Sequence, residues 1–126
     1  MIETEWAQAF AQEWIAAWND GDLERVLAHY ADDFEITSPL IVQRLGIANG
    51  SLKGKDAIRP YWAQGLAAQP KLTFELLDVL AGVSSVAIYY RNVTRARSVV
   101  EWIGFDPQRR AIRSDILWAV TSPSSH

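Results

Sequence analysis

The sequence predicts an α+β fold in which helices pack on one face of a mostly antiparallel sheet. Two observations predict it. The first half of the chain holds three segments with helical periodicity and one strand, and the second half holds four strand-like segments separated by turns. Consecutive strands of this kind are typical of an antiparallel meander. The 126 residues suffice for one hydrophobic core, so residues 1–126 are expected to form a single domain with a frayed tail at 121–126.

The first helix is expected to begin near residue 4 and to end near residue 18. Trp6, Phe10, Trp14 and Trp18 recur at every fourth position, which gives one broad apolar face. Thr4 has a side chain suited to the N-cap. The helix is therefore expected to place a row of aromatic rings against the sheet.

A second helix and the first strand follow the turn WNDGD. Gly21 suits the left-handed position after the first helix, and Asp22 suits the N-cap of a second helix over about residues 23–31. In FEITS, residues 34–38, every second side chain is expected to face inward, which predicts a strand. Pro39 is expected to end it.

Residues 40–50, LIVQRLGIANG, are apolar but show no clear period. Two interpretations stay open for them, a flap over a site or an additional strand. The next segment, LKGKDAIRPYWAQGL, predicts a third helix with Ile58 and Trp62 facing inward. Pro60 then requires either an irregular first turn or a later helix start.

Four strands are expected at residues 71–80, 85–93, 96–105 and 111–120. SVAIYYRNV and SVVEWIGF do not alternate apolar with polar residues, as strands of an antiparallel sheet covered on one side do. Both faces are therefore expected to be covered, one by the helices and the other by a second copy of the chain. The sequence predicts a homodimer formed through the outer sheet face.

Composition excludes several classes of function. The net charge of −3 and the pI near 5.3 argue against a nucleic-acid surface, and no apolar run is long enough for a membrane span. The N-terminus lacks signal-peptide character. Without cysteine the chain has no disulfide or thiolate metal site, and this composition fits a cytoplasmic protein. Two histidines cannot form a three-histidine zinc site, and no glycine-rich phosphate loop is present, so neither metal nor cofactor is expected.

The order of motifs resembles a known superfamily. WIAAWNDGDLERVLAHYADDFEITSP, then GSLKGKDAIRPYW, then GFDPQRRAIR are similar to the nuclear-transport-factor-2-like superfamily and, more closely, to its bacterial SnoaL-like branch. The resemblance covers about residues 5–118. It implies a cone in which a strongly curved sheet wraps around the helices and leaves a pocket. It also implies dimers formed through the outer sheet face.

Among the enzymes of this superfamily, ketosteroid isomerase matches best around YADD. The positions of its aspartate base, its tyrosine and its protonated aspartate correspond to Ser38, Trp14 and Glu101. A serine without a nearby histidine cannot act as the base, and an indole cannot act as an acid. Of the three positions, only Glu101 keeps a side chain with the required chemistry, so the isomerase mechanism is not expected.

Three other enzyme types also match incompletely. The Asp–Arg–Asp set of limonene-epoxide hydrolase finds Arg97 and Asp115, but Val99 occupies the position two after Arg97. Scytalone dehydratase and the SnoaL cyclases rely on pocket or meander histidines, and His29 is the only internal histidine. None of these mechanisms transfers to the chain.

Glu101 is the most informative single residue. It lies in the middle of an apolar strand, where a carboxylate costs free energy unless it is paired or neutral. If it faces the pocket, its pKa should rise and it could act as the catalytic acid–base. The alternative is a structural ion pair with Arg91 on the adjacent strand. Further pocket residues are expected from the aromatic and polar positions of the cone, namely Trp14, Trp18, Tyr30, Phe34, Ser38, Trp62, Tyr89 and Arg91.

Other polar residues have simpler explanations. Asp32 and Asp33 are expected to hydrogen-bond backbone N–H groups in a turn between helix and strand. His29 is expected at the margin of its helix as a surface or packing residue. A cluster of arginines could bind a phosphate or a carboxylate, but solvated hairpin ends explain it more simply; its members are Arg91, Arg95, Arg97, Arg109, Arg110 and Arg113.

Three functions remain open. The first is a SnoaL-like protein whose aromatic pocket binds a hydrophobic small molecule with one polar group, read by Glu101. As an enzyme it would work by proton transfer, as an isomerase, a dehydratase or a cyclase. The second is a non-catalytic dimeric binding or regulatory module. The third is sequestration of a metabolite without turnover.

Overall fold

The computed structural model describes residues 1–120 and confirms the α+β fold. The expected tail at 121–126 lies outside the described residues. The helices are α1 (Thr4–Asn19), α2 (Leu23–Leu27), α3 (Pro39–Leu45) and α4 (Lys55–Ala68). The strands are β1 (Tyr30–Thr37), β2 (Ser51–Lys53), β3 (Phe74–Ala81), β4 (Ser85–Asn92), β5 (Arg97–Phe105) and β6 (Ala111–Trp118).

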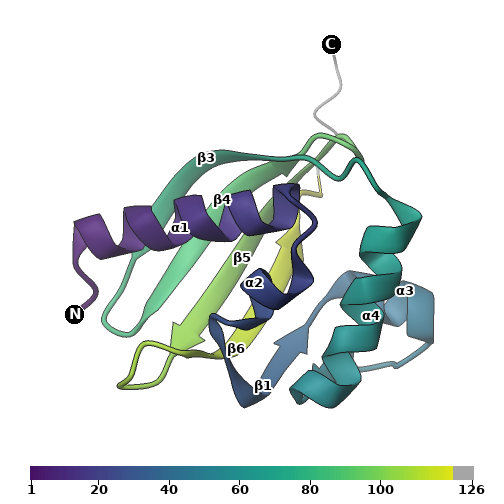
Figure 1. Ribbon diagram of the computed structural model, residues 1–126, viewed down its shortest axis with the longest axis horizontal. Coiled ribbons are helices and arrows are strands. Elements are labelled where there is room, and N and C mark those ends of the chain that lie inside the picture. Colours follow the sequence, from purple (N-terminus) through teal and green to yellow (C-terminus); the bar gives the residue numbers. More distant parts are fainter. Residues whose placement is uncertain (121–126) are drawn as a thin grey trace.

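The strands form one sheet in the order β2-β1-β6-β5-β4-β3. Strands β3 to β6 form the expected antiparallel meander, β1 joins β6 in parallel, and β2 pairs antiparallel with β1. The sheet curls without closing, and α1 crosses in front of β3 and β4 while α4 stands beyond β1 (Figure 1). This is the cone that the resemblance implied.

The inner face of the meander packs against the helices. On β4, Val86, Ile88 and Tyr90 are buried, and on β5 Val99 and Ile103 are buried at the alternate positions that face the same side. The rings of Trp14 and Tyr90 lie 5.5 Å apart, between α1 and β4. Burial of these large side chains between α1 and the sheet stabilises the fold.

The outer face of the meander also carries apolar side chains. Tyr89 lies opposite Val100, which lies opposite Leu117, and Trp102 and Leu80 both lie opposite Ala87. We call Leu80, Tyr89, Trp102 and Leu117 the outer apolar patch, since all four side chains are exposed. The lack of alternation in the sequence therefore reflects apolar residues on both faces.

The turn between α1 and α2 forms as predicted. Gly21 has a left-handed φ of 66°, and the Asp22 carboxylate accepts a hydrogen bond from Arg25 N at 3.2 Å. The N-cap prediction for Thr4 is wrong, because Thr4 is the first helical residue and Glu3 is the N-cap. The carbonyl of Glu3 already accepts from Ala7 N at 3.0 Å.

The second helix is shorter than predicted. It ends at Leu27, before residue 31, because Tyr30 is already paired with Ala111 in the sheet. The Ala111 N–H donates to the His29 carbonyl at 2.8 Å. Pairing with β6 therefore prevails over the helical pattern of the local sequence.

Residues 39–53 form elements that the sequence did not resolve. The segment is neither a simple flap nor one strand, but the helix α3 followed by a turn and the short strand β2. Pro39 is the first residue of α3, and Gly46 ends that helix with a φ of 69°.

Proline does not delay the start of α4. The helix begins at Lys55 and contains Pro60 in its interior. Ala57 N and Ile58 N both donate to the Gly54 carbonyl, which is a common arrangement at the start of a helix. None of the helices within residues 1–120 has the length and apolarity needed to cross a membrane.

Candidate functional site

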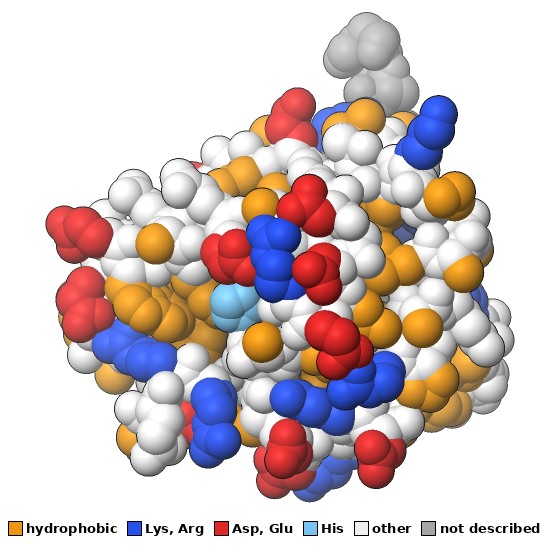
Figure 2. All heavy atoms as spheres, in the orientation of Figure 1, with side chains coloured by type: hydrophobic (Ala, Val, Ile, Leu, Met, Phe, Trp, Pro, Cys, Tyr) orange, Lys and Arg blue, Asp and Glu red, His pale blue; other side chains and the backbone are white. Residues whose placement is uncertain are grey.

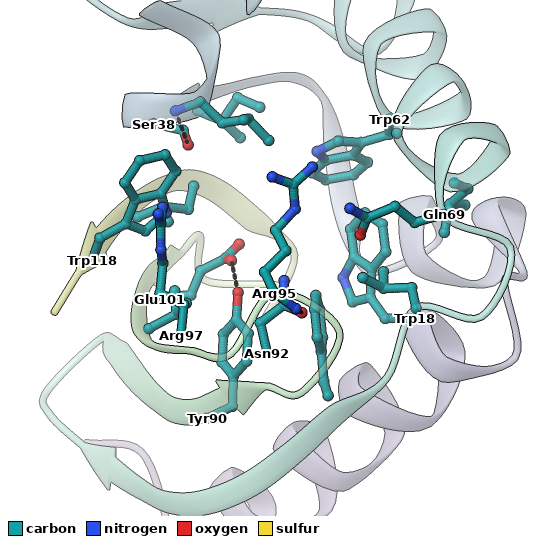
Figure 3. Close-up of a pocket in the computed structure, with 18 of the residues that line it drawn as sticks. Trp18, Ser38, Trp62, Gln69, Tyr90, Asn92, Arg95, Arg97, Glu101 and Trp118 are labelled. Atoms are coloured by element: carbon teal, nitrogen blue, oxygen red, sulfur yellow. Dashed lines mark hydrogen bonds between the residues drawn. The ribbon is translucent and has the colours of Figure 1, made fainter. Parts of the chain in front are cut away.

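A cavity of about 140 Å³ lies between the helices and the inner face of the sheet. Its walls are largely aromatic: Trp14 and Trp18 come from α1, Trp62 from α4, and Tyr90 and Trp118 from the sheet. The last four are labelled in Figure 3. An engineered cavity of about 150 Å³ is large enough to bind benzene. The enclosed part of this site therefore has room for about one ring.

The carboxyl group of Glu101 forms part of the cavity wall. The side chain is 5% exposed. Its Oε2 accepts a hydrogen bond from Ser114 Oγ at 2.9 Å. Tyr90 OH lies 3.5 Å from Oε1, a contact marked in Figure 3. Both partners are neutral hydroxyl groups, so the carboxyl is held in place without a counter-charge.

Burial raises the pKa of Glu101 to about 7, while the hydrogen bonds from Ser114 and Tyr90 act in the opposite direction. Burial, followed by the charge of Glu101, raises the pKa of Tyr90 well above its usual range. The tyrosine therefore stays a hydrogen-bond donor. Near neutral pH the glutamic acid exists in both protonation states, which a general acid–base requires.

Strand alternation explains why Glu101 faces the cavity. In SVVEWIGF, Val99, Glu101 and Ile103 point inward, and the register places Glu101 between Ile88 on β4 and Ile116 on β6. The acid therefore replaces an apolar residue in an otherwise apolar row. Its free-energy cost is consistent with a role other than packing.

The alternative ion pair between Glu101 and Arg91 is wrong. Arg91 lies opposite Ser98 on β5 and Glu75 on β3, so it belongs to the outer-facing positions of β4. Glu101 belongs to the inner-facing positions of β5. The two side chains differ by one step of the alternation and lie on opposite faces.

The structure places some predicted pocket residues at the cavity and others elsewhere. Trp14, Trp18, Ser38 and Trp62 line it, together with Glu101. Tyr30 and Phe34 are almost completely buried in the core and do not reach the cavity wall. The prediction that Tyr89 and Arg91 are pocket residues is wrong. Both lie at the positions of β4 whose side chains point to the outer face of the sheet, away from the cavity.

Tyr30 supports the cavity wall from behind. Its hydroxyl accepts a hydrogen bond from Trp14 Nε1 at 3.0 Å, and both side chains are fully buried. Burial raises the pKa of Tyr30 well above its usual range, so the hydroxyl stays protonated. This contact fixes the indole of Trp14 at the cavity wall.

Ser38 has a structural role in addition to its place in the lining. It is the N-cap of α3, and its Oγ accepts a hydrogen bond from Leu40 N at 3.2 Å. A cap hydroxyl satisfies a free backbone N–H at the helix start. This contact agrees with the expectation that Ser38 is not a base.

Sequence reasoning missed three basic residues of the cavity. Arg95 and Arg97 line it from the β4–β5 hairpin, and Arg44 lines it from α3. The first two were expected to be solvated at a hairpin end. Arg97 is two residues before Val99 and four before Glu101. Because every second side chain of a strand points to the same face, the sequence of β5 could have predicted that Arg97 faces inward.

Asp32, Asp33 and His29 lie outside the lining of the cavity. Both aspartates belong to β1 and are exposed, rather than part of a turn, and Asp32 Oδ1 lies 3.5 Å from Lys55 Nζ. His29 packs edge-on against Phe10, with Nε2 3.5 Å from Glu13 Oε2. Within the described residues no group of three metal-ligating side chains comes together.

Comparison with known proteins identifies the family. The model of the SnoaL-like domain matches residues 11–120. The chain belongs to the SnoaL-like family. No curated protein is significantly similar to it in sequence.

Solved structures agree with this assignment. A SnoaL-like protein of unknown function from Burkholderia thailandensis is 45% identical to this SnoaL-like chain, with a TM-score of 0.91, over 94% of this chain and 98% of that one. The putative hydroxylase AclR from Streptomyces galilaeus is 17% identical, with a TM-score of 0.71, over 95% and 93% of the two chains.

A third solved structure is SalBIII, an epoxide hydrolase/cyclase-like enzyme with a role in pyran ring formation in the polyether salinomycin. It is 18% identical to this SnoaL-like chain, with a TM-score of 0.74, over 97% of each chain. At these identities AclR and SalBIII show the shared fold alone.

Proposed function

We propose that this SnoaL-like protein binds a small, mostly apolar molecule in the aromatic cavity and that Glu101 exchanges a proton with it. The single observation that carries the proposal is a buried carboxyl, with a pKa of about 7, in the wall of a cavity large enough for a ring. A pKa near the working pH is what proton transfer requires. Isomerisation, dehydration and cyclisation are the reactions that such a group can serve without a cofactor.

Each neighbour of Glu101 has a distinct role in this proposal. Ser114 and Tyr90 are positioning residues that hold the carboxyl by hydrogen bonds. Trp14 and Trp62 exclude water and provide flat surfaces for an apolar ligand. When it is protonated, Glu101 donates a hydrogen bond to a carbonyl or hydroxyl oxygen of the ligand.

Two solved structures show that this fold occurs in proteins described as enzymes. SalBIII is described as an epoxide hydrolase/cyclase-like enzyme and AclR as a putative hydroxylase, and both have this fold. Small-molecule chemistry is therefore compatible with the cone. The residues that would perform it here are those of this chain's own cavity.

Binding of a single-ring ketone such as cyclohexanone, measured by calorimetry between pH 5 and pH 9, tests the proposal. Protonated Glu101 donates to the carbonyl, so affinity should fall as the pH rises through about 7. Glu101→Gln should bind with affinity independent of pH. Glu75→Gln, which changes an exposed acid of the outer face, should keep the profile of the unchanged protein.

Proton exchange is tested with the same ketone in deuterium oxide. Exchange of the protons next to its carbonyl, followed by proton NMR, should be accelerated by the protein but not by Glu101→Gln. Acceleration by both proteins, or by neither, would contradict an acid–base role. Binding without acceleration would instead favour the non-catalytic module.

We also propose that the outer apolar patch joins two copies of the chain. Exposed apolar side chains from β3, β4, β5 and β6 lie together on it, and an area of this kind is typical of a contact with another protein surface. The patch is on the opposite face of the sheet from Glu101. A dimer formed there leaves the cavity unobstructed.

A further inference from the structure

Three arginines line the cavity that also contains Glu101. Arg44 comes from the short helix α3, and Arg95 and Arg97 come from the β4–β5 hairpin, far from Arg44 in the sequence. The fold brings their side chains to one site, and Figure 3 shows Arg95 and Arg97 at it. Within residues 1–120, none of the three forms a salt bridge with a carboxylate.

Other arginines of the chain do have carboxylate partners. Arg25 pairs with Glu13 and Asp20, and Arg59 pairs with Glu24. Figure 2 shows basic and acidic side chains side by side on the face of the molecule where α1, α2 and α4 lie in Figure 1. The same pairing holds for Arg109 with Glu3 and for Arg110 with Asp106. The cavity arginines therefore differ from these arginines in lacking a counter-charge.

Neutral groups hold the cavity arginines in place. The guanidinium of Arg97 lies over the ring of Trp118, 3.7 Å from its centroid. The Gln69 amide, turned so that its oxygen faces Arg95, accepts from Nε and Nη2 at 3.0 Å each. Stacking and amide contacts orient a guanidinium but leave its positive charge uncompensated.

Arg44 approaches α4 where that helix has no side chain. A Cβ added to Gly65 would lie 3.4 Å from Arg44 Nη1. Burial raises the pKa of Tyr61, and the nearby positive charges of Arg44 and Arg95 partly oppose that rise. The charges of two guanidinium groups from different elements therefore both act on the hydroxyl of Tyr61.

The charge balance of the lining is positive. Within residues 1–120, Glu101 is the only acidic residue that lines the cavity, and both of its hydrogen-bond partners are hydroxyl groups. While Glu101 is protonated, the three arginines are the only charged side chains that this part of the chain contributes to the wall. A site of this composition attracts an anion, because guanidinium groups match the geometry of carboxylate and phosphate oxygens.

We infer that the natural ligand carries an oxyanion, a carboxylate or a phosphate, which Arg44, Arg95 and Arg97 hold while its apolar body occupies the aromatic cavity. The inference rests on the proposed function, because it assumes that the cavity takes an apolar ligand. The oxyanion is a second polar group of that ligand, in addition to the carbonyl or hydroxyl oxygen that contacts Glu101. The ligand class is thus a ring-sized acid or phosphate ester.

Matched aryl compounds test this inference. Dissociation constants are measured by calorimetry for 3-phenylpropionate, 2-phenylethyl phosphate and the neutral 3-phenylpropanamide. At least one anion should bind about tenfold more tightly than the amide. The anion that shows the preference identifies the oxyanion as carboxylate or phosphate.

Variants then assign the preference to the arginines. Arg44→Met, Arg95→Met and Arg97→Met should each reduce it several-fold while leaving affinity for the amide unchanged. Arg113→Met is the matched control, because Arg113 is exposed on β6 opposite Glu35, and it should keep the preference. Amide binding that is unchanged in all four variants shows that they are folded and that the cavity is intact.

The failure of this inference can be distinguished from failure of the proposed function. Equal affinity for anions and amide, or a preference that survives all three cavity substitutions, would overturn the oxyanion site but leave the apolar cavity intact. No binding of any aryl compound or ketone would overturn both. Loss of the preference in Arg113→Met to the same extent would show a general charge effect and would also overturn it.

Discussion

The hydroxyl of Ser114 donates a hydrogen bond to Oε2 of Glu101 at 2.9 Å, and both residues are almost completely buried. Ser114 lies on β6 next to the strand that carries Glu101. A hydrogen bond to the ionised carboxylate lowers its pKa, and burial raises it. The protonation of the cavity acid is therefore set by the balance between these two effects.

Ser114→Ala should raise the pKa of Glu101 further. The substitution removes a hydrogen bond that favours the ionised form, and one such bond corresponds to roughly one pKa unit. The carboxyl carbon resonance of Glu101, followed against pH by NMR, measures the change. Ser98→Ala, on the outer face of β5, should leave the titration midpoint of Glu101 unchanged. An unchanged midpoint in Ser114→Ala would show that the hydrogen bond from Ser114 does not lower the pKa of Glu101.

Glu101→Gln should change how stability depends on pH. The folded protein holds the acid with a pKa of about 7 instead of the ordinary 4.5. Below pH 4.5 both the folded and the unfolded chain bind the proton, so the group contributes no penalty. Above that value the unfolded chain ionises first, and stability falls until the pH reaches about 7.

At high pH the raised pKa of Glu101 lowers the free energy of unfolding by roughly 3 kcal/mol. Urea unfolding at pH 4.5 and pH 8 should show that Glu101→Gln gains stability relative to the unchanged protein by up to roughly this amount at the higher pH. Glu75→Gln serves as the control. A constant difference between Glu101→Gln and the unchanged protein at both pH values would be incompatible with a raised pKa.

Tyr30→Phe should destabilise the protein. The substitution removes the acceptor for Trp14 Nε1 and leaves a buried N–H group without a partner. Such a loss costs roughly 1–3 kcal/mol. Urea unfolding of Tyr30→Phe, Trp14→Phe and the double variant gives the coupling between the two; purely additive effects would show that the contact contributes nothing.

Leu117→Glu should prevent the proposed dimer from forming. The residue is half exposed in the outer apolar patch, where a carboxylate would be buried against the second copy. Sedimentation velocity at micromolar concentration measures the change. Val83→Glu, at an exposed apolar position outside the patch, should remain dimeric, and a monomeric unchanged protein would exclude this interface.

The sequence predicted the elements whose patterns are local. The aromatic face of α1, the turn at Gly21 and Asp22 and the four strands of the meander all follow from periodicity and turn chemistry. It did not predict α3, because a helix of seven residues with few polar positions has no clear period. The second helix was overestimated because pairing of Tyr30 with β6 is a long-range effect.

The candidate site was predictable only in part, because it depends on register. The inward direction of Glu101 could be inferred from the apolar residues on either side of it, and the aromatic residues of α1 from their spacing. Tyr89 and Arg91 were assigned to the pocket because their position relative to Glu101 depends on the β4–β5 register, which the turn sequence does not fix. Arg44 comes from α3, and its approach to the hairpin arginines depends on tertiary packing.

The pKa of Glu101 in the ligand-free protein is the most direct test of the account. Carboxyl carbon NMR, with Glu101→Gln to assign the resonance, should give a midpoint near 7, and saturation with cyclohexanone should raise that midpoint because the ketone binds the protonated acid. A midpoint near 4.5 that does not respond to the ketone would mean that the carboxyl is solvated and unconnected with the cavity, and the proposed chemistry would be wrong.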